Sequence, residues 1–255
     1  MKKNMDKLIF EDFAPLLGEW ADRFRPFIES QAMFDIYQTL KNEREVIVPS
    51  SDVTFRSFAN CSPKNLKSIW FLMDPYPRRY KIQPGEKVGR NQATGIPMAC
   101  ENSPDGKLQP SLEVFYETMS KDLGKKVEQT PDLRYLLQQG VLLLNSDLTC
   151  KLNKTNSHDR LWEPFMKFFL EDVLAGFSGL VYVLSGNVSH RLEKYINPFS
   201  GYIYKIEHPA AASHTHKTWN NKDIFNVTNK ILKLNNNECI LWDAKEYKET
   251  LEPPF

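Results

Sequence analysis

Four short apolar runs constrain the fold of this sequence more than any other feature. Each is rich in leucine, β-branched or aromatic residues, and segments with helical spacing separate them: 66–73, 141–145, 179–186 and 201–208. Such runs are typical of parallel strands that are buried on both faces. Because strands that alternate with helices form parallel sheets through right-handed crossovers, we predict an α/β fold: a single domain with a central four-stranded parallel sheet flanked by helices on both faces.

Helical spacing of apolar residues accounts for most of the remaining chain. Residues 5–43 predict two or three amphipathic helices, so residues 1–60 are expected to be a mostly helical N-terminal part of one domain that spans residues 1–255. Residues 46–60 are expected to be loop with a short ordered segment. Further helices are predicted at 110–121, closed by Gly124, and at 131–139, 161–174, 188–195 and 218–233.

Composition excludes several classes of protein. The chain has 33 basic and 32 acidic residues, a net charge of +1, so binding to nucleic acid would require a local basic patch. The cysteines are scattered without a C-x-x-C pair, which argues against a zinc site or a disulfide framework and indicates a reducing compartment. No apolar run approaches the ~20 residues of a membrane span, and the first residues lack the apolar core of a secretory signal. We therefore expect a soluble, intracellular protein.

Three of the predicted strands end on polar residues that can do chemistry. Asp74 follows the first strand, Asn145 closes the second and His208 closes the fourth. Taken singly, each is more typical of a turn or a loop than of a site. The carboxyl ends of parallel strands meet at one edge of a sheet, where α/β proteins bind ligands. Together the three residues therefore predict a functional site with a carboxylate, an amide and an imidazole.

A basic loop follows Asp74. Residues 77–92 carry Arg78, Arg79, Lys81, Lys87 and Arg90. Long loops inside compact domains are often functional, whereas a run of charges is often only a solvated surface. The residues alone leave both interpretations open.

The segments around these residues resemble the signature regions of uracil-DNA glycosylases of the family 1 type. The resemblance extends from about residue 60 to the end of the chain, and its segments occur in the order of the family. They are Leu72–Pro77 for the water-activating motif, Pro110–Leu112 for the phosphate-gripping loop, Leu142–Asn145 for the uracil-reading strand, Ser157–Phe165 for the Ser-His and Trp-Glu-x-Phe segment, His208–Ser213 for the minor-groove loop and Ile240–Trp242 for the closing motif.

The resemblance implies a monofunctional DNA repair glycosylase without lyase activity. Such an enzyme flips uracil out of DNA and hydrolyses its bond to deoxyribose, which leaves an abasic site. The implied catalytic residues are Asp74, which orients water, and His208, which donates to uracil O2. No cofactor or metal is implied. The implied partner is uracil-containing DNA, with a replication protein or a proteinaceous inhibitor as a further partner, and the protein is expected to act as a monomer.

The resemblance also assigns residues to the base and to the DNA strand. Asn145 would read the uracil edge, because cytosine presents the opposite donor and acceptor pattern, and Tyr76 would fill the space of the thymine methyl group. Met73 and Met98 complete the implied uracil pocket. The implied DNA contacts are Pro110, Ser111, Ala212, Ser213, His214 and Lys217, with Arg78 and Arg79 as basic support.

Several positions depart from the family pattern. Met98 stands where the family has a stacking phenylalanine, and Ala212 stands where it has an intercalating leucine. Met73 replaces a glutamine and Pro77 a histidine. Pro77 and the His208–Ala211 string resemble the poxvirus branch, in which the glycosylase is also a polymerase processivity adaptor.

Two alternatives remain open on the sequence. The first is a DNA-binding replication or processivity adaptor on a glycosylase scaffold, with weak or lost cleavage. The second is a metal hydrolase that uses His208, His214 and His216, although no acidic or cysteine ligand lies at a convincing spacing. Retention of Asp74, Asn145 and His208 favours an active glycosylase, because a binding module has no physical need for all three.

Overall fold

The centre of the molecule is a parallel sheet. The computed structural model describes residues 10–215 and 218–251. Its four-stranded sheet has the order β3-β2-β5-β6, with strands β2 (Ser68–Leu72), β3 (Val141–Asn145), β5 (Leu180–Ser185) and β6 (Gly201–Ile206). All residues of β2, β3 and β5 are buried, as their apolar runs require, whereas the edge strand β6 is partly exposed. The predicted α/β fold and its four strands are confirmed.

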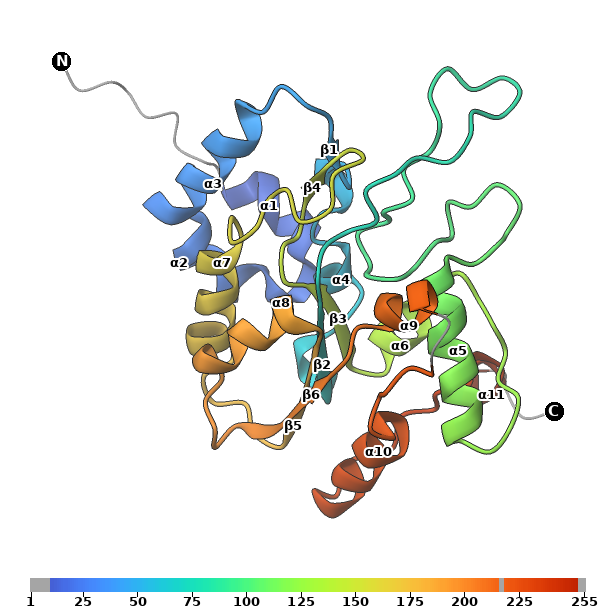
Figure 1. The fold of residues 1–255 in the computed structure, drawn as a ribbon. Helices are drawn as coiled ribbons and strands as arrows, with labels where there is room; N and C mark the ends of the chain where they lie inside the picture. Colours follow the sequence, from blue (N-terminus) through green and yellow to red (C-terminus); the bar gives the residue numbers. More distant parts are fainter. Residues whose placement is uncertain (1–9, 216–217, 252–255) are drawn as a thin grey trace.

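Helices lie on both sides of this sheet (Figure 1). The N-terminal part forms helices α1 (Phe10–Leu17), α2 (Ala21–Ile28), α3 (Gln31–Lys41) and α4 (Arg56–Ala59). Later helices are α5 (Pro110–Asp122), α6 (Arg134–Gln138), α7 (Glu163–Phe168), α8 (Asn187–His190), α9 (Pro209–Thr215), α10 (Ile224–Leu234) and α11 (Ala244–Leu251). A π-helical turn, Phe169–Val173, extends α7, and a 3-10 turn, Arg191–Tyr195, extends α8.

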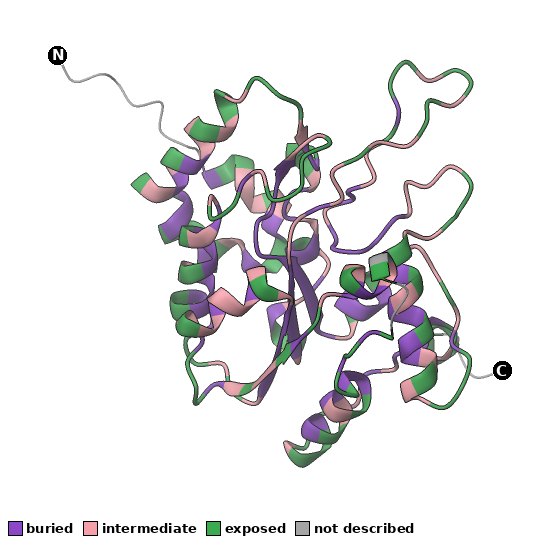
Figure 2. Ribbon diagram, in the orientation of Figure 1, coloured by how far each residue is buried: buried purple, intermediate pink, exposed green. Residues whose placement is uncertain are grey.

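Aromatic side chains join the helices to the sheet in one continuous core. On the side of α1, α2, α3 and α7, Phe24 stacks on Phe165 with ring centroids 4.8 Å apart. On the side of α5 and α10, Trp70 of β2 contacts Phe115 and Phe225 at 5.9 and 5.8 Å. Figure 2 shows this burial running through the sheet and along the inner faces of the helices. The core therefore holds the strands, and the residues at their ends, in fixed positions.

The register of the strands determines how far along the sheet Asp74, Asn145 and His208 lie. Leu72 pairs with Asn145 across β2 and β3, so Asp74 lies just beyond the level of Asn145. Ser185 pairs with Ile206 across β5 and β6, which places His208 beyond the same edge. The sheet therefore presents all three predicted site residues at its carboxyl edge.

The last long helix differs from its prediction. It was expected to begin at residue 218, but α10 begins at Ile224. Lys222 and Asp223 adopt left-handed backbone conformations, and the Asn221 side chain accepts a hydrogen bond from the Asp223 N–H at 3.2 Å. This local turn competes with the helix, as asparagine side chains often do.

Some short elements gave no clear sequence signal. Strands β1 (Ile47–Val48) and β4 (Cys150–Lys151) form a small antiparallel pair that was not predicted as strands. Helices α9 and α11 were not predicted either. Among the described helices, none combines the length and the apolar character needed to cross a membrane.

Candidate active site

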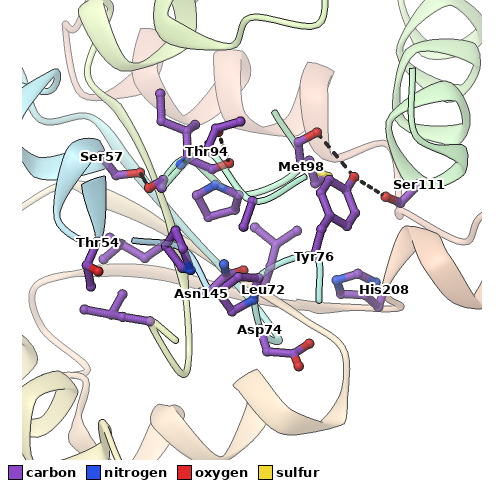
Figure 3. Close-up of a pocket in the computed structure, with 18 residues that line it drawn as sticks. Thr54, Ser57, Leu72, Asp74, Tyr76, Thr94, Met98, Ser111, Asn145 and His208 are labelled. Atoms are coloured by element: carbon purple, nitrogen blue, oxygen red, sulfur yellow. Dashed lines mark hydrogen bonds between the residues drawn. The ribbon is translucent and has the colours of Figure 1, made fainter. Parts of the chain in front are cut away.

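A cavity at the carboxyl edge of the sheet brings the three strand-end residues together. Asp74, Asn145 and His208 all line it (Figure 3). Three more of the residues assigned by resemblance line the same cavity: Tyr76, Met98 and Ser111. A carboxylate, an amide and an imidazole therefore face one small space from three different strand ends.

Asp74 is held by a backbone donor from a distant loop. The Asn156 N–H donates to Asp74 Oδ2 at 2.5 Å. Burial raises the pKa of Asp74 to about 6, although this hydrogen bond acts in the opposite direction. At neutral pH the side chain is therefore mainly a carboxylate, oriented by a fixed donor and able to accept a proton from water.

The loop that carries Asn156 is itself fixed by hydrogen bonds. Asn156 has a φ of 54°, a left-handed conformation that asparagine tolerates better than most residues. Ser157 Oγ accepts from the Lys151 N–H at 2.7 Å and donates to the Lys154 carbonyl at 2.8 Å. The Asn153 N–H donates to the Pro77 carbonyl at 2.6 Å, which joins this loop directly to the segment after Asp74.

The Ser-His and Trp-Glu segment has a structural part in this arrangement. Thr149 Oγ1 accepts from the Trp162 indole N–H and lies 2.8 Å from His158 Nδ1. His158 is 7% exposed and does not line the cavity. These contacts fix the end of the loop that carries Asn156. The segment therefore supports Asp74 indirectly, because the Asn156 N–H donates to its carboxylate.

The side-chain amide of Asn145 faces the cavity without a hydrogen bond to the other residues that line it. Its side chain is only 8% exposed, and Figure 3 shows no hydrogen bond from it to the other residues that line the cavity. The backbone is secured beside it, because Ser146 donates to the Leu72 carbonyl through its N–H at 2.9 Å and its hydroxyl at 2.6 Å. A largely buried amide on a rigid strand end is suited to read a ligand that offers one donor and one acceptor.

His208 is neutral and its tautomer follows from a backbone contact. Burial lowers the pKa of His208 to about 4. The Ala210 N–H donates to His208 Nδ1 at 3.1 Å, so Nδ1 carries a lone pair and the ring proton is on Nε2. The site therefore has a neutral imidazole whose Nε2–H can donate to a bound group.

Gly186 leaves room for the histidine. Gly186 has a φ of 88°, and a Cβ at this position would lie only 3.0 Å from His208 Cβ. The Gly186 N–H also donates to the Ile206 carbonyl at 2.9 Å. A larger residue here would be strained and would push the imidazole out of place.

A hydroxyl pair positions the tyrosine of the cavity. Tyr76 OH and Ser111 Oγ are 2.6 Å apart, and Tyr76 OH is 3.3 Å from the Met98 carbonyl (Figure 3). Met98 is 6% exposed and has a φ of 63°, which is uncommon for a residue other than glycine. These contacts link the phenol ring, the first turn of α5 and the loop at Met98 into one wall.

The N-terminal part contributes to the site, which the sequence did not reveal. Pro49, Thr54 and Ser57 line the cavity, together with the loop at 93–97. Ser57 Oγ donates to the Gly95 carbonyl at 3.2 Å. A Cβ on Gly95 would collide with a backbone carbonyl at 1.9 Å, so only glycine permits this close approach.

The residues predicted to contact DNA lie on α5 and α9, and they differ in exposure. Pro110 and Ser111 begin α5, which packs against α9, and Ser213 lies on α9 with its hydroxyl bonded to the Ala210 carbonyl at 2.9 Å. Ala212 is only 4% exposed and belongs to the core, and its contact with DNA stays a prediction. The helical winding of α9 turns this side chain inward and leaves Ala211 exposed.

Other predicted residues lie outside the cavity. Met73 does not line it, and its carbonyl accepts from the Asp147 N–H at 3.2 Å. Arg78 is exposed, whereas Arg79 is partly buried and donates to Asn91 Oδ1 at 2.9 Å. Lys217 and the side chain of His214 lie outside the described part of the structure.

The described side chains hold no group of three histidine, cysteine, aspartate or glutamate residues that could bind a metal ion. The metal hydrolase interpretation relied on His214 and His216, and neither side chain is among those described. It therefore gains no support from the geometry of the described residues.

Comparison with known proteins gives one consistent group of relatives. No protein-family model matches the chain. A uracil-DNA glycosylase from Campylobacter jejuni strain RM1221 is 30% identical over 216 residues, which cover 83% of this chain and 85% of the relative. A uracil-DNA glycosylase from Pseudomonas aeruginosa strain PAO1 is 28% identical over 240 residues, 92% of this chain and 98% of the relative.

Solved structures agree with these relatives at the level of the fold. The crystal structure of mimivirus uracil-DNA glycosylase superposes with a TM-score of 0.78 and 24% identity, over 93% of this chain and 90% of that chain. A variant of the mimivirus protein, solved in complex with UGI, gives the same TM-score at 25% identity over 90% of each chain. The match in fold thus extends over most of the chain.

Proposed function

The chain belongs to the uracil-DNA glycosylase family, and from that premise we propose that it excises uracil from DNA with Asp74, Asn145 and His208 arranged around one extruded nucleotide. The observation that supports this most directly is the shared cavity at the end of the sheet. The product is free uracil and an abasic site, and the enzyme is a monofunctional hydrolase.

Asp74 acts on the sugar side of the reaction. As the bond between uracil N1 and the deoxyribose C1′ breaks, positive charge develops on the sugar. The carboxylate stabilises this charge and orients the water whose oxygen bonds to C1′. The water gives up one proton, Asp74 is placed to receive it, and the departing uracil anion takes up a proton afterwards.

His208 acts on the base side of the reaction. Negative charge develops on uracil as it departs, and the Nε2–H of a neutral imidazole can donate a hydrogen bond to its O2. The low pKa of His208, caused by burial, keeps the ring neutral at physiological pH. The hydrogen bond from Ala210 fixes the tautomer that this role needs.

Asn145 and Tyr76 select the base. The Asn145 carbonyl can accept from uracil N3–H while its amide donates to O4, and cytosine would leave both groups unsatisfied. Such a mismatch can discriminate by about 10⁴-fold or more. Tyr76 occupies the place of the thymine methyl group and is anchored there by Ser111. Met98 covers the base with a thioether in place of an aromatic ring.

Contacts to the strand would hold the flipped nucleotide. Extrusion costs a few kcal/mol of unstacking, which contacts to the DNA backbone must offset. Pro110, Ser213 and the basic residues Arg78 and Arg79 are candidates at the ends of α5 and α9 and in the neighbouring loop. We keep His214 and Lys217 as candidates by resemblance.

The proposal also covers the oligomeric state, the compartment and the partners of the protein. The protein acts as a monomer inside the cell on uracil-containing DNA and needs no cofactor. A proteinaceous inhibitor is a further candidate partner, since a variant of the mimivirus relative was solved in complex with UGI.

A cleavage assay separates this function from an adaptor without activity. Oligonucleotides with one uracil, thymine or cytosine at the same position are incubated with the protein, and abasic sites are cut with alkali. The proposal predicts cleavage of the uracil strand alone, also in EDTA. Binding without cleavage would instead support the adaptor.

A further inference from the structure

The loop after the cavity is an ordered hairpin with a concentrated positive charge. Residues 77–92 contain five basic residues and one acidic residue, a net charge of +4, whereas the whole chain carries +1. The rest of the chain is therefore acidic overall, at −3. This segment is where a polyanion would be attracted.

Backbone hydrogen bonds show that the segment is more than a solvated run of charges. Arg79 and Asn91 form an antiparallel bridge, and the Tyr80 N–H donates to the Arg90 carbonyl at 2.9 Å. A Cβ on Gly89 would lie 2.0 Å from the Tyr80 carbonyl, so glycine is required for the two arms to approach. The backbone of the hairpin therefore has a defined path.

Both arms of the hairpin begin at the cavity. Residues 74–76 precede it and residues 93–98 follow it, and both segments line the cavity. Gln109, just before α5, donates to the Tyr80 hydroxyl at 3.2 Å. Figure 1 shows the hairpin as the teal loop that projects from the body. An arm of about seven residues reaches at most about 25 Å, the length of roughly seven base pairs.

Two lysines of the hairpin are available for contacts. Lys81 and Lys87 are exposed, and among the described residues no carboxylate forms an ion pair with either. The one acid, Glu86, is paired with Arg90 at 2.6 Å. In contrast, lysines elsewhere are often paired, such as Lys194 with Glu163. Ile82 and Val88 are also exposed beside these charges, at 61% and 56%.

We propose that the hairpin of residues 77–92 binds the phosphate backbone of DNA several nucleotides away from the extruded base, through Lys81 and Lys87. This inference rests on the proposed function and extends it, because it makes the enzyme select long substrates over short ones. The positive charge of the hairpin favours nucleic acid as its partner. Because both arms of the hairpin begin at the cavity, the hairpin would lie over the DNA strand that flanks the extruded base.

The test compares substrate lengths at several salt concentrations. The variant K81Q/K87Q removes both charges, K81R/K87R keeps them, and K230Q/K233Q removes two exposed charges on α10 as a matched control. Each protein is assayed by kcat/KM on a duplex of about 30 base pairs and on a trinucleotide with central uracil, which is too short to reach the tip of the hairpin.

The inference predicts that K81Q/K87Q loses activity on the duplex alone. The slope of log kcat/KM against log salt should fall by about two units, because each phosphate contact contributes about 0.9. K81R/K87R and K230Q/K233Q should match the wild type. Equal slopes for K81Q/K87Q and the wild type would overturn the inference, as would an equal loss on both substrates.

A second readout keeps the two proposals separate. Binding to a uracil-free duplex is measured by fluorescence anisotropy in the same salt series. If the wild type excises no uracil at all, the proposed function fails, and the anisotropy slope still decides whether the hairpin binds DNA. If the salt dependence of duplex binding is the same in K81Q/K87Q as in the wild type, the hairpin does not bind DNA and the inference is refuted.

Discussion

The backbone N–H of Ala210 donates to Nδ1 of His208 across 3.1 Å. This contact assigns the ring proton to Nε2, and burial lowers the pKa of His208 to about 4, so the ring stays neutral. The first turn of α9 thus fixes the direction in which the imidazole of His208 can donate a hydrogen bond.

The state of His208 can be observed directly. In protein labelled with ¹⁵N in the imidazole, we expect His208 at pH 7 to show the neutral Nε2–H form and to become charged only near pH 4. His190 and His158 in the same spectrum serve as internal references. A charged ring or an Nδ1–H form at pH 7 would contradict the assigned role.

The pH dependence of activity should follow Asp74. Because burial raises its pKa to about 6, the required carboxylate is present above that pH and is lost as the pH falls through it. We expect log kcat/KM to fall with a slope of one below about pH 6. Asp147→Asn is the control, since burial also raises the pKa of Asp147 to about 6 but this residue lies outside the cavity. A flat profile between pH 5 and 7 would argue against Asp74.

Base selection should change when the amide of Asn145 is replaced. In Asn145→Asp, burial favours the protonated carboxyl, which offers the donor and acceptor that cytosine needs. Release of cytosine should rise about tenfold or more above the wild type, and release of uracil should fall. Asn145→Ala should release neither base well. Cytosine release at the wild-type level in Asn145→Asp would contradict the reading role.

Stacking on the base should improve with an aromatic side chain at Met98. Base stacking on an aromatic ring contributes about 1–3 kcal/mol, so inhibition by free uracil should tighten about fivefold or more in Met98→Phe. Met98→Leu, which adds no ring, should stay near the wild type. An unchanged inhibition constant in Met98→Phe would show that Met98 does not cover the base.

The strands and the residues at their ends were predictable because burial on both faces leaves a strong pattern. The run 141–145 became β3 without change, and the register of β2 with β3 follows from the same apolar burial. Asp74, Asn145 and His208 could be chosen because strand ends in a parallel sheet share one edge.

Features that depend on tertiary contacts were not predictable. The two-residue strands β1 and β4 are too short to show a period, and α10 starts late because of a local asparagine turn. The contribution of Thr54 and Ser57 to the cavity depends on the close approach of Gly95, which no pattern in the sequence displays. The inward position of Ala212 likewise depends on how α9 packs.

The central claim, that one cavity hydrolyses the bond to an extruded uracil, is tested most directly by Asp74→Asn. Removing this partly buried charge should not lower the Tm, because burial raises the pKa of Asp74 and so disfavours the carboxylate in the folded state. The variant should bind uracil-containing duplex as the wild type does, while single-turnover excision falls by about 100-fold or more. Excision at a near-normal rate by the folded variant would contradict the account.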